Sequence, residues 1–232
     1  MTGTGNPGDR PNDSKDLWEK VHSQMPNHEI ALGRAMAAAY VTDPKMVAFV
    51  ASRYKFVAKM IEGADVVLEV GCGDGFGAPL VAQTAGRVVC TDIHTGTLED
   101  NRRRLGVFPN IEFQYFDFRL KHYPDPVAGV FAVDVLEHIY PTEEQRFLAN
   151  IAASLTEHGI GLFGTPNAAA EAFASPNSRL GHVNLKDHKA LKKALGAHFH
   201  NVFIFSMNDE VIHTGYYPMA HYLWALCVDP RR

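Results

Sequence analysis

The chain has 232 residues, of which 46% are hydrophobic and 21% charged, so it can bury one large core and is not a wholly disordered protein. Its 22 lysines and arginines against 26 aspartates and glutamates give a net charge of −4, which disfavours a general nucleic-acid binder. The longest apolar run, residues 216–228, is too short to cross a membrane. Three separated cysteines without a C-x-x-C pair, and the lack of an apolar leader, predict a reduced, cytoplasmic protein.

The N-terminal region changes character near residue 17. The first sixteen residues are rich in Gly, Pro, Asn and Asp and lack apolar periodicity, so we expect a flexible tail over residues 1–16. Apolar residues at helical spacing then predict helices at 29–40 and 43–61. We expect one domain over residues 17–232, in which these helices partly cover an α/β core over residues 62–232.

From Val66 onward, short β-branched or aromatic runs alternate with helical segments, which is typical of a parallel sheet with helices on both faces. The predicted parallel strands are 66–70, 87–91, 111–115, 128–134 and 160–164. The predicted helices are 77–85, 96–105, 142–155 and 186–196. Two further runs, 201–207 and 219–228, are joined by a loop without a helix and should be antiparallel. We therefore expect a Rossmann-like α/β sheet of seven strands, six parallel and one antiparallel.

A strand that runs directly into closely spaced glycines is the densest signal in the chain. Glycines stand at positions 71, 73, 75 and 77, where a tight turn lets a ligand approach the backbone before the next helix begins. The spacing also fits the dinucleotide pattern GxGxxA at Gly73, Gly75 and Ala78, so the loop alone leaves a nicotinamide cofactor open. Asp92, at the end of the second strand, can bind a ribose diol in either scheme.

Four segments together resemble the class I S-adenosylmethionine-dependent methyltransferases, and most closely the small-molecule group with a D-x-L-E-H segment. They are Glu69-Val-Gly-Cys-Gly-Asp-Gly75, Asp92, Asp117-Phe118 and Asp134-Val-Leu-Glu-His138. The resemblance covers about residues 60–205 and implies S-adenosylmethionine as the cofactor, without a metal. It implies that the cofactor is bound by Glu69, Gly71, Gly73 and Gly75 around the methionine moiety, Asp92 on the ribose, Asp117 on the adenine amine, Ile93 and Phe118 against the adenine ring, and Asp134 beside the methionine.

Methyl transfer to an oxygen or a protonated amine also needs a group that takes up a proton, and histidine suits this near neutral pH. His138 ends the D-x-L-E-H segment, at the edge where ligands of open α/β sheets bind, and His182 follows the fifth strand. We predict both as general-base candidates, with backbone-anchored loop histidines as the alternative. His198 and His200 share a strand face but have no third ligand at useful spacing, so we predict no metal site.

Three further residues are candidate acceptor-binding groups. Asn167 closes the fifth strand, and His213 and Tyr217 lie in the polar, aromatic loop between the last two predicted strands. The alternatives are a turn cap for Asn167 and a simple strand connection for the loop. For Arg53, in the second helix, we expect packing or solvent exposure, with a lid over the acceptor as the alternative.

The prediction for function is therefore transfer of a methyl group to an O or N atom of a small polar metabolite, with a sugar or sugar nucleotide as one candidate. Methylation of nucleic-acid base amines is disfavoured, because Asp134-Val-Leu-Glu137 replaces the Asn/Asp-Pro-Pro-aromatic segment of those enzymes. An NAD(P)-dependent oxidoreductase is a weaker alternative, since no Tyr-x-x-x-Lys pair follows the fifth strand. A non-catalytic, cofactor-binding partner of another subunit is the second alternative.

Overall fold

The computed structural model describes residues 13–232, and the chain divides into two units, residues 1–31 and 32–232. In the first unit, helix α1 (Ser14–Ser23) begins at Asp13, whose carboxylate accepts hydrogen bonds from the amides of Lys15 and Asp16 at 2.8 and 3.2 Å. The predicted tail therefore needs correction. Residues 1–12 lie outside the described residues, and residues 14–16 form the first turn of α1 because Asp13 caps it. Within residues 13–232, no helix is long and apolar enough to cross a membrane.

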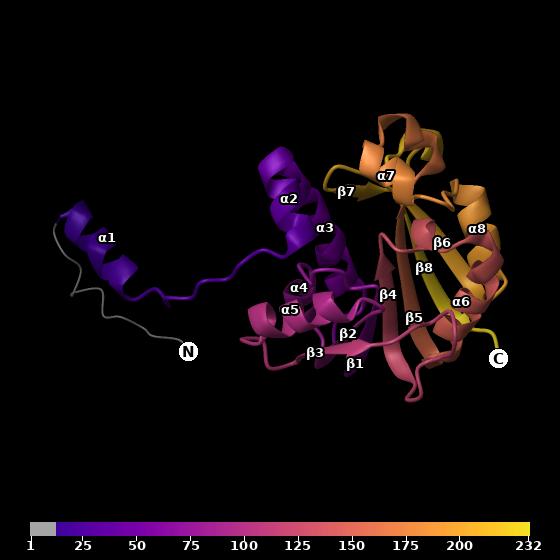
Figure 1. Ribbon diagram of the computed structural model, residues 1–232, viewed down its shortest axis with the longest axis horizontal. Helices are drawn as coiled ribbons and strands as arrows, with labels where there is room; N and C mark the ends of the chain where they lie inside the picture. The colour runs from indigo at the N-terminus through magenta and orange to yellow at the C-terminus, as the bar shows by residue number, and fades with distance from the viewer. Residues whose placement is uncertain (1–12) are drawn as a thin grey trace. The chain divides into compact units, whose positions relative to one another are not determined.

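The second unit is built on one mixed sheet with the strand order β3-β2-β1-β4-β5-β8-β6-β7 (Figure 1). Strands β1 to β5 are parallel to one another, whereas β8 lies antiparallel between β5 and β6. The strands are β1 (Val66–Val70), β2 (Arg87–Asp92), β3 (Ile111–Tyr115), β4 (Val127–Val133), β5 (Leu155–Pro166), β6 (Phe199–Asn208), β7 (Val211–His213) and β8 (Tyr222–Pro230).

The Rossmann-like α/β class predicted from the sequence is confirmed, with one strand more than the seven expected. The additional strand, β7, lies in the connection that we predicted as a plain loop. It pairs Asn208 with Val211 across a two-residue turn, and Asp209 adopts a positive φ of 51° there. A turn this short folds the chain straight back on β6 and so creates a hairpin at the sheet edge.

Helices cover both faces of the sheet (Figure 1). Because side chains alternate along a strand, Leu68 and Val70 pack on one face while Val67 packs on the other. The Val67 face is covered by α3 (Lys45–Met60), α4 (Ala78–Ala82) and α5 (Thr95–Leu105). The Leu68 face is covered by α6 (Pro141–Ala153) and α8 (His188–Gly196).

Two N-terminal helices of this unit meet the carboxyl edge of the parallel strands, which is where open α/β sheets bind ligands. Helix α2 (Arg34–Thr42) is held there by Asp74 of the glycine loop, whose Oδ2 accepts a hydrogen bond from the Met36 amide at 2.8 Å. Helix α3 sends Arg53 to Asp134 at the end of β4. This edge therefore carries both the glycine loop and contacts from the preceding helices.

Candidate active site

The glycine loop leaves β1 with three residues in the left-handed region. Gly71, Gly73 and Gly75 have φ values of 69°, 50° and 68°, which favour glycine strongly. A Cβ on Gly71 would lie 2.7 Å from Cγ2 of Val135, so close packing also requires a glycine there. A Cβ on Gly73 would meet no atom within 4 Å. Gly73 therefore faces open space, as expected of backbone that a ligand approaches.

Asp92 is fixed against this loop by hydrogen bonds to both of its carboxylate oxygens. Oδ2 accepts from the Gly73 amide at 3.0 Å, and Oδ1 accepts from the His94 amide at 2.9 Å. Asn101 of α5 donates to the Gly73 carbonyl at 2.8 Å, so the loop is held from a second side. A carboxylate oxygen has more than one acceptor site, and Asp92 can therefore still accept hydrogen bonds from a diol.

The loop, Asp92 and the ends of β3 and β4 enclose a cavity of about 370 Å³. This volume is within the range of small-molecule and cofactor sites. The cavity brings together most of the predicted cofactor residues and one predicted base. Those on its wall are Gly71, Gly73, Asp92, Ile93, Asp117, Phe118, Asp134 and His138.

Two predicted cofactor residues, Glu69 and Gly75, are not on the wall of this cavity. The Glu69 carboxyl is buried below the loop, where Oε1 accepts from the Tyr54 hydroxyl at 2.7 Å and Oε2 from the Cys90 thiol at 3.1 Å. Burial raises the pKa of Glu69 to about 7. Gly75 packs against α5, where a Cβ would lie 3.0 Å from Leu105. In this structure both residues support the loop from behind.

Asp117 is clamped by an arginine that sequence reasoning did not single out. Arg119 donates from Nε to Oδ1 at 3.0 Å and from Nη2 to Oδ2 at 2.7 Å, and its own amide also binds Oδ1. These charge-assisted bonds lower the pKa of Asp117 below its usual value. Asp117 and Arg119 are two residues apart just after β3, and this spacing was the only feature of the sequence that could have indicated their ion pair. Asp117 thus presents a fixed, ionised carboxylate at the cavity wall.

Arg53 reaches from α3 to the other end of the cavity. Its Nη1 lies 2.6 Å from Oδ2 of Asp134, and its guanidinium lies over the Tyr222 ring, 4.0 Å from the centroid. Asp134 has a φ of 57°, which is rare for a residue other than glycine and is typical of functional sites. For Arg53 we expected packing or solvent exposure, with a lid over the acceptor as the alternative. The structure gives packing: the side chain is largely buried and contacts Asp134 at the candidate site.

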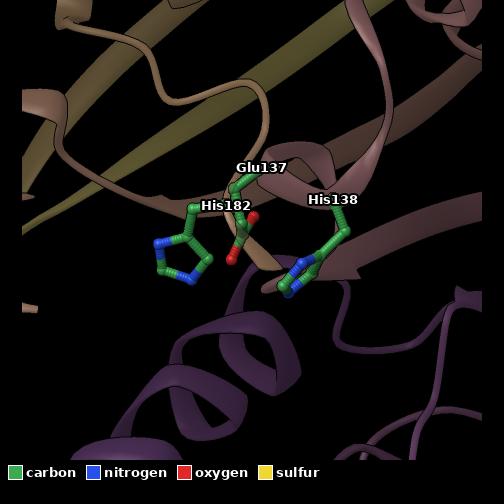
Figure 2. Close-up of side chains that lie close together, drawn as sticks. All are labelled: Glu137, His138 and His182. Atoms are coloured by element: carbon green, nitrogen blue, oxygen red, sulfur yellow. The ribbon is translucent and has the colours of Figure 1, made fainter. Parts of the chain in front are cut away.

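Glu137, His138 and His182 form a compact polar cluster beside this ion pair, in which the two imidazoles contact each other and the Glu137 carboxylate lies near both (Figure 2). Glu137 is completely buried, Oε2 accepts from the Thr165 hydroxyl at 3.1 Å, and Oε1 has no partner. Burial and the nearby negative charge of Asp134 raise the pKa of Glu137 to about 8. Sequence reasoning named the two histidines and missed Glu137, although it stands inside the D-x-L-E-H segment.

The two imidazoles of this cluster differ in their hydrogen bonds. His138 Nδ1 lies 2.8 Å from the Gly181 carbonyl, which can only accept, so Nδ1 carries the proton and Nε2 keeps its lone pair. His182 Nδ1 is buried without a partner, and the ring centroids lie 5.3 Å apart. Burial, and then the neighbouring His138, lower the pKa of His182. A neutral His182 can accept a proton or a cation.

The three predicted acceptor-binding residues have their polar atoms occupied elsewhere. The Asn167 amide donates to the carbonyls of Tyr217 and Ala220, each at 2.8 Å, and its Oδ1 accepts from the Ala169 amide. His213 uses both ring nitrogens within its hairpin, toward Asn208 and Gly215. The Tyr217 hydroxyl donates to the Ile204 carbonyl. The turn and strand-connection alternatives are the ones that this geometry supports, so we correct the expectation that these three side chains face the acceptor.

Sequence relatives of the chain are methyltransferases. Residues 67–159 match a family model described as a methyltransferase domain. A probable S-adenosylmethionine-dependent methyltransferase from Mycolicibacterium smegmatis is 33% identical over 117 residues, which are 49% of this chain and 42% of that protein. One from Mycobacterium tuberculosis H37Rv is 34% identical over 104 residues, 44% of this chain and 35% of that protein. The chain therefore spans less than half the length of these relatives.

Solved structures with a similar fold include complexes with S-adenosyl-L-homocysteine. The N-methyltransferase NodS from Bradyrhizobium japonicum WM9, in complex with S-adenosyl-L-homocysteine, matches with a TM-score of 0.60 and 14% identity, over 78% of this chain and 86% of that chain. The complex of DhpI with the same product matches with a TM-score of 0.63 and 18% identity, over 86% and 93%. At these identities the likeness shows the fold alone.

Proposed function

We propose that the chain is a class I S-adenosylmethionine-dependent methyltransferase that transfers the cofactor's methyl group to an O or N atom of a small polar metabolite. The methyltransferase-domain match over residues 67–159 and the similar relatives and structures support this proposal. The cofactor would lie in the cavity of about 370 Å³, with its ribose on Asp92 and its adenine beside Asp117 and Phe118. The acceptor would approach from the Glu137–His138–His182 cluster. In the simplest mechanism an imidazole of this cluster takes the acceptor's proton as general base.

The observation that carries this proposal is the charge of the cavity wall beside the glycine loop. The carboxylates of Asp92, Asp117, Asp134 and Glu143 line the cavity. Arg119 pairs with Asp117 and Arg53 with Asp134, so the four carboxylates keep an excess of negative charge over these two arginines. Such a wall favours the positively charged amine and sulfonium of S-adenosylmethionine, whereas the pyrophosphate of a dinucleotide needs donors. The methyl group already carries a good leaving group, so alignment of acceptor, methyl and sulfur should supply much of the rate.

Calorimetric titration with S-adenosylhomocysteine tests the cofactor part of this proposal. We expect saturable binding by the wild type, loss of binding in Asp92→Ala, and unchanged binding in Asp65→Ala. Asp65 is a matched control because it is exposed and immediately precedes β1, at the opposite edge of the sheet from Asp92. Equal affinity in all three proteins would remove Asp92 from the site. Binding of NAD in place of S-adenosylhomocysteine would overturn the proposal.

Transfer of labelled methyl from S-adenosylmethionine into the small-molecule fraction of a cell extract tests the catalytic part. If His138 or His182 is the base, replacing it with Gln should lower kcat by about 10²–10⁴-fold without weakening S-adenosylhomocysteine binding. The exposed His200 on β6 provides the matched control, His200→Gln. A protein that binds the cofactor product but labels nothing in the extract would favour the alternative of a non-catalytic partner.

A further inference from the structure

We propose that Glu137, His138 and His182 bind a divalent transition-metal cation, which in turn holds an oxygen atom of the acceptor. This inference rests on the proposed function for its chemistry, since it specifies how the acceptor is bound and activated. It replaces our expectation of no metal site, which considered only ligand spacing along the sequence. Two imidazoles and a carboxylate are ligands that zinc, manganese, iron and cobalt accept in proteins.

The first argument is geometry. One ligand atom from each of the three residues lies within 4.8 Å of the other two. Bond lengths of about 2.0–2.2 Å place the ligand atoms of a tetrahedral ion about 3.4 Å apart, so small side-chain rotations would close the site. Figure 2 shows the Glu137 carboxylate near both rings, where it can share an ion with them. His138 is exposed and lines the cavity, so an ion here would be open to the acceptor.

The second argument is that the cluster contains a buried polar atom without a partner, Glu137 Oε1, inside a residue that has no solvent exposure. A buried acceptor without a hydrogen bond costs about 1–3 kcal/mol, and more when charged, so such atoms call for a ligand. His138 adds the free lone pair of Nε2, because its Nδ1 hydrogen bonds the Gly181 carbonyl. A cation at this cluster would give both Glu137 Oε1 and His138 Nε2 a partner.

The third argument is that the surrounding hydrogen bonds orient the ligands in advance. The Thr165 hydroxyl binds Glu137 Oε2 and thereby leaves Oε1 for the ion. The Glu137 carbonyl accepts from the amides of Val183 and Asn184 at 2.8 and 3.1 Å, which ties the loop after His182 to the segment that carries the other two ligands. Bonds of this kind, from a ligand to a carbonyl or hydroxyl, commonly fix the tautomer and direction of metal ligands.

The chemistry follows from the open positions that three protein ligands leave on an ion. A hydroxyl of the acceptor would bind there, and the cation would lower its pKa so that the proton passes to solvent. The oxygen lone pair would then form a C–O bond to the methyl carbon as the C–S bond breaks, giving a methyl ether and S-adenosylhomocysteine. In the metal-bound form the histidines hold the ion and do not accept the proton. The acceptor would be an alcohol or phenol, preferably with a second oxygen adjacent to chelate the cation.

Calorimetric titration of the full chain, treated with EDTA and then dialysed, with MnCl₂ and separately with CoCl₂ tests this site. We expect one ion per chain, and visible Co²⁺ absorption bands that change on binding. Glu137→Gln and His182→Gln should each weaken binding by more than about 100-fold, beyond the loss typical of an outer hydrogen-bond partner. The double variant His198→Gln with His200→Gln removes the other histidine pair and should bind as the wild type does. Retained S-adenosylhomocysteine binding by each variant would show that it is folded.

Three results would overturn the inference: no stoichiometric ion, an ion that binds equally to both cluster variants, or an ion lost in the control. Its failure is distinguishable from failure of the proposed function, because S-adenosylhomocysteine is titrated without metal. A chain that binds the cofactor product but no ion retains the proposed function and loses the metal site. A chain that binds an ion but no S-adenosylhomocysteine loses the proposed function, and with it the acceptor chemistry argued here.

Discussion

Arg53 of α3 and Asp134 at the end of β4 form a partly buried ion pair, 2.6 Å between Nη1 and Oδ2, although they are 81 residues apart in the chain. The pair joins a helix that precedes the sheet to the wall of the cavity beside the glycine loop. The same guanidinium also lies over the ring of Tyr222 on β8, which gives it a second contact. One arginine therefore connects α3, the cavity wall at Asp134 and the last strand, β8.

Replacement of Arg53 should destabilise the fold, because Asp134 would lose its partner while remaining near Glu137. We expect Arg53→Met to lower the free energy of unfolding by about 1–3 kcal/mol, less than for a fully buried pair because the Asp134 side chain is 35% exposed. Arg53→Lys keeps the charge but loses the contact of the guanidinium with the Tyr222 ring, so the decrease in the free energy of unfolding should be smaller than for Arg53→Met. Urea denaturation of the three proteins measures this. Equal losses for Met and Lys would show that stacking, and not the ion pair, is the larger contribution.

Glu69 should make stability fall as pH rises through the weakly acidic range. Burial raises its pKa to about 7 in the folded chain from a usual value of 4.5, so between these values the unfolded chain releases the proton first. Stability from the neutral carboxyl is complete below about pH 4.5 and is lost as pH approaches 7, at about 1.4 kcal/mol per pKa unit.

The matched variants are Glu69→Gln, which is neutral at every pH, and Glu62→Gln at an exposed position. Urea denaturation at pH 5, 6, 7 and 8 should show a shallower fall for Glu69→Gln than for the wild type, and a parallel curve for Glu62→Gln. A residual fall is expected in Glu69→Gln, because the pKa of Glu137 is also raised, to about 8. Parallel curves for all three proteins would contradict a raised pKa at Glu69.

Gly73 and Gly77 should respond differently to alanine. At Gly73 the added Cβ meets no protein atom. Gly73→Ala should therefore lower the free energy of unfolding by about 1–2 kcal/mol, because alanine disfavours the left-handed φ at this position. The same Cβ would point into the space proposed for the cofactor and should weaken S-adenosylhomocysteine binding strongly. At Gly77 a Cβ would overlap the Tyr54 ring, so Gly77→Ala should lower the melting temperature more than Gly73→Ala does. Thermal melts with and without S-adenosylhomocysteine separate the two effects; unchanged ligand stabilisation in Gly73→Ala would contradict this placement.

The sequence predicted the parts of the molecule that local pattern determines. The fold class is confirmed, and the match of residues 67–159 to a methyltransferase-domain model agrees with the family that the glycines and acidic residues indicated. The loop and Asp92 could be placed together because β1 and β2 are neighbours in such a sheet. The residues proposed to bind the cofactor stay predictions.

The contacts between distant segments could not be read from local pattern. Arg53 meets Asp134 only because of the position in which α3 packs on the sheet, and no residue near Arg53 in the sequence indicates this partner. Asn167 shows the reverse case: its position at a strand end suggested a ligand, whereas its amide ties that strand to the carbonyls of Tyr217 and Ala220. Thr165 became important only when β5 brought its hydroxyl to Glu137.

Thr165→Val tests whether the hydroxyl on β5 orients the proposed metal ligand, because valine has nearly the same shape but donates no hydrogen bond. Without it, Glu137 Oε2 loses its donor and the carboxylate can turn away from the two imidazoles. We expect affinity for Mn²⁺ to fall by about 10–100-fold, while S-adenosylhomocysteine binds as before. Thr84→Val is the matched control, because the Thr84 hydroxyl donates to the Ala58 carbonyl of α3 and lies outside the cluster. If Mn²⁺ affinity is the same in both variants, Thr165 does not hold the carboxylate in its binding direction, and the ion would have to be held by the three ligands alone.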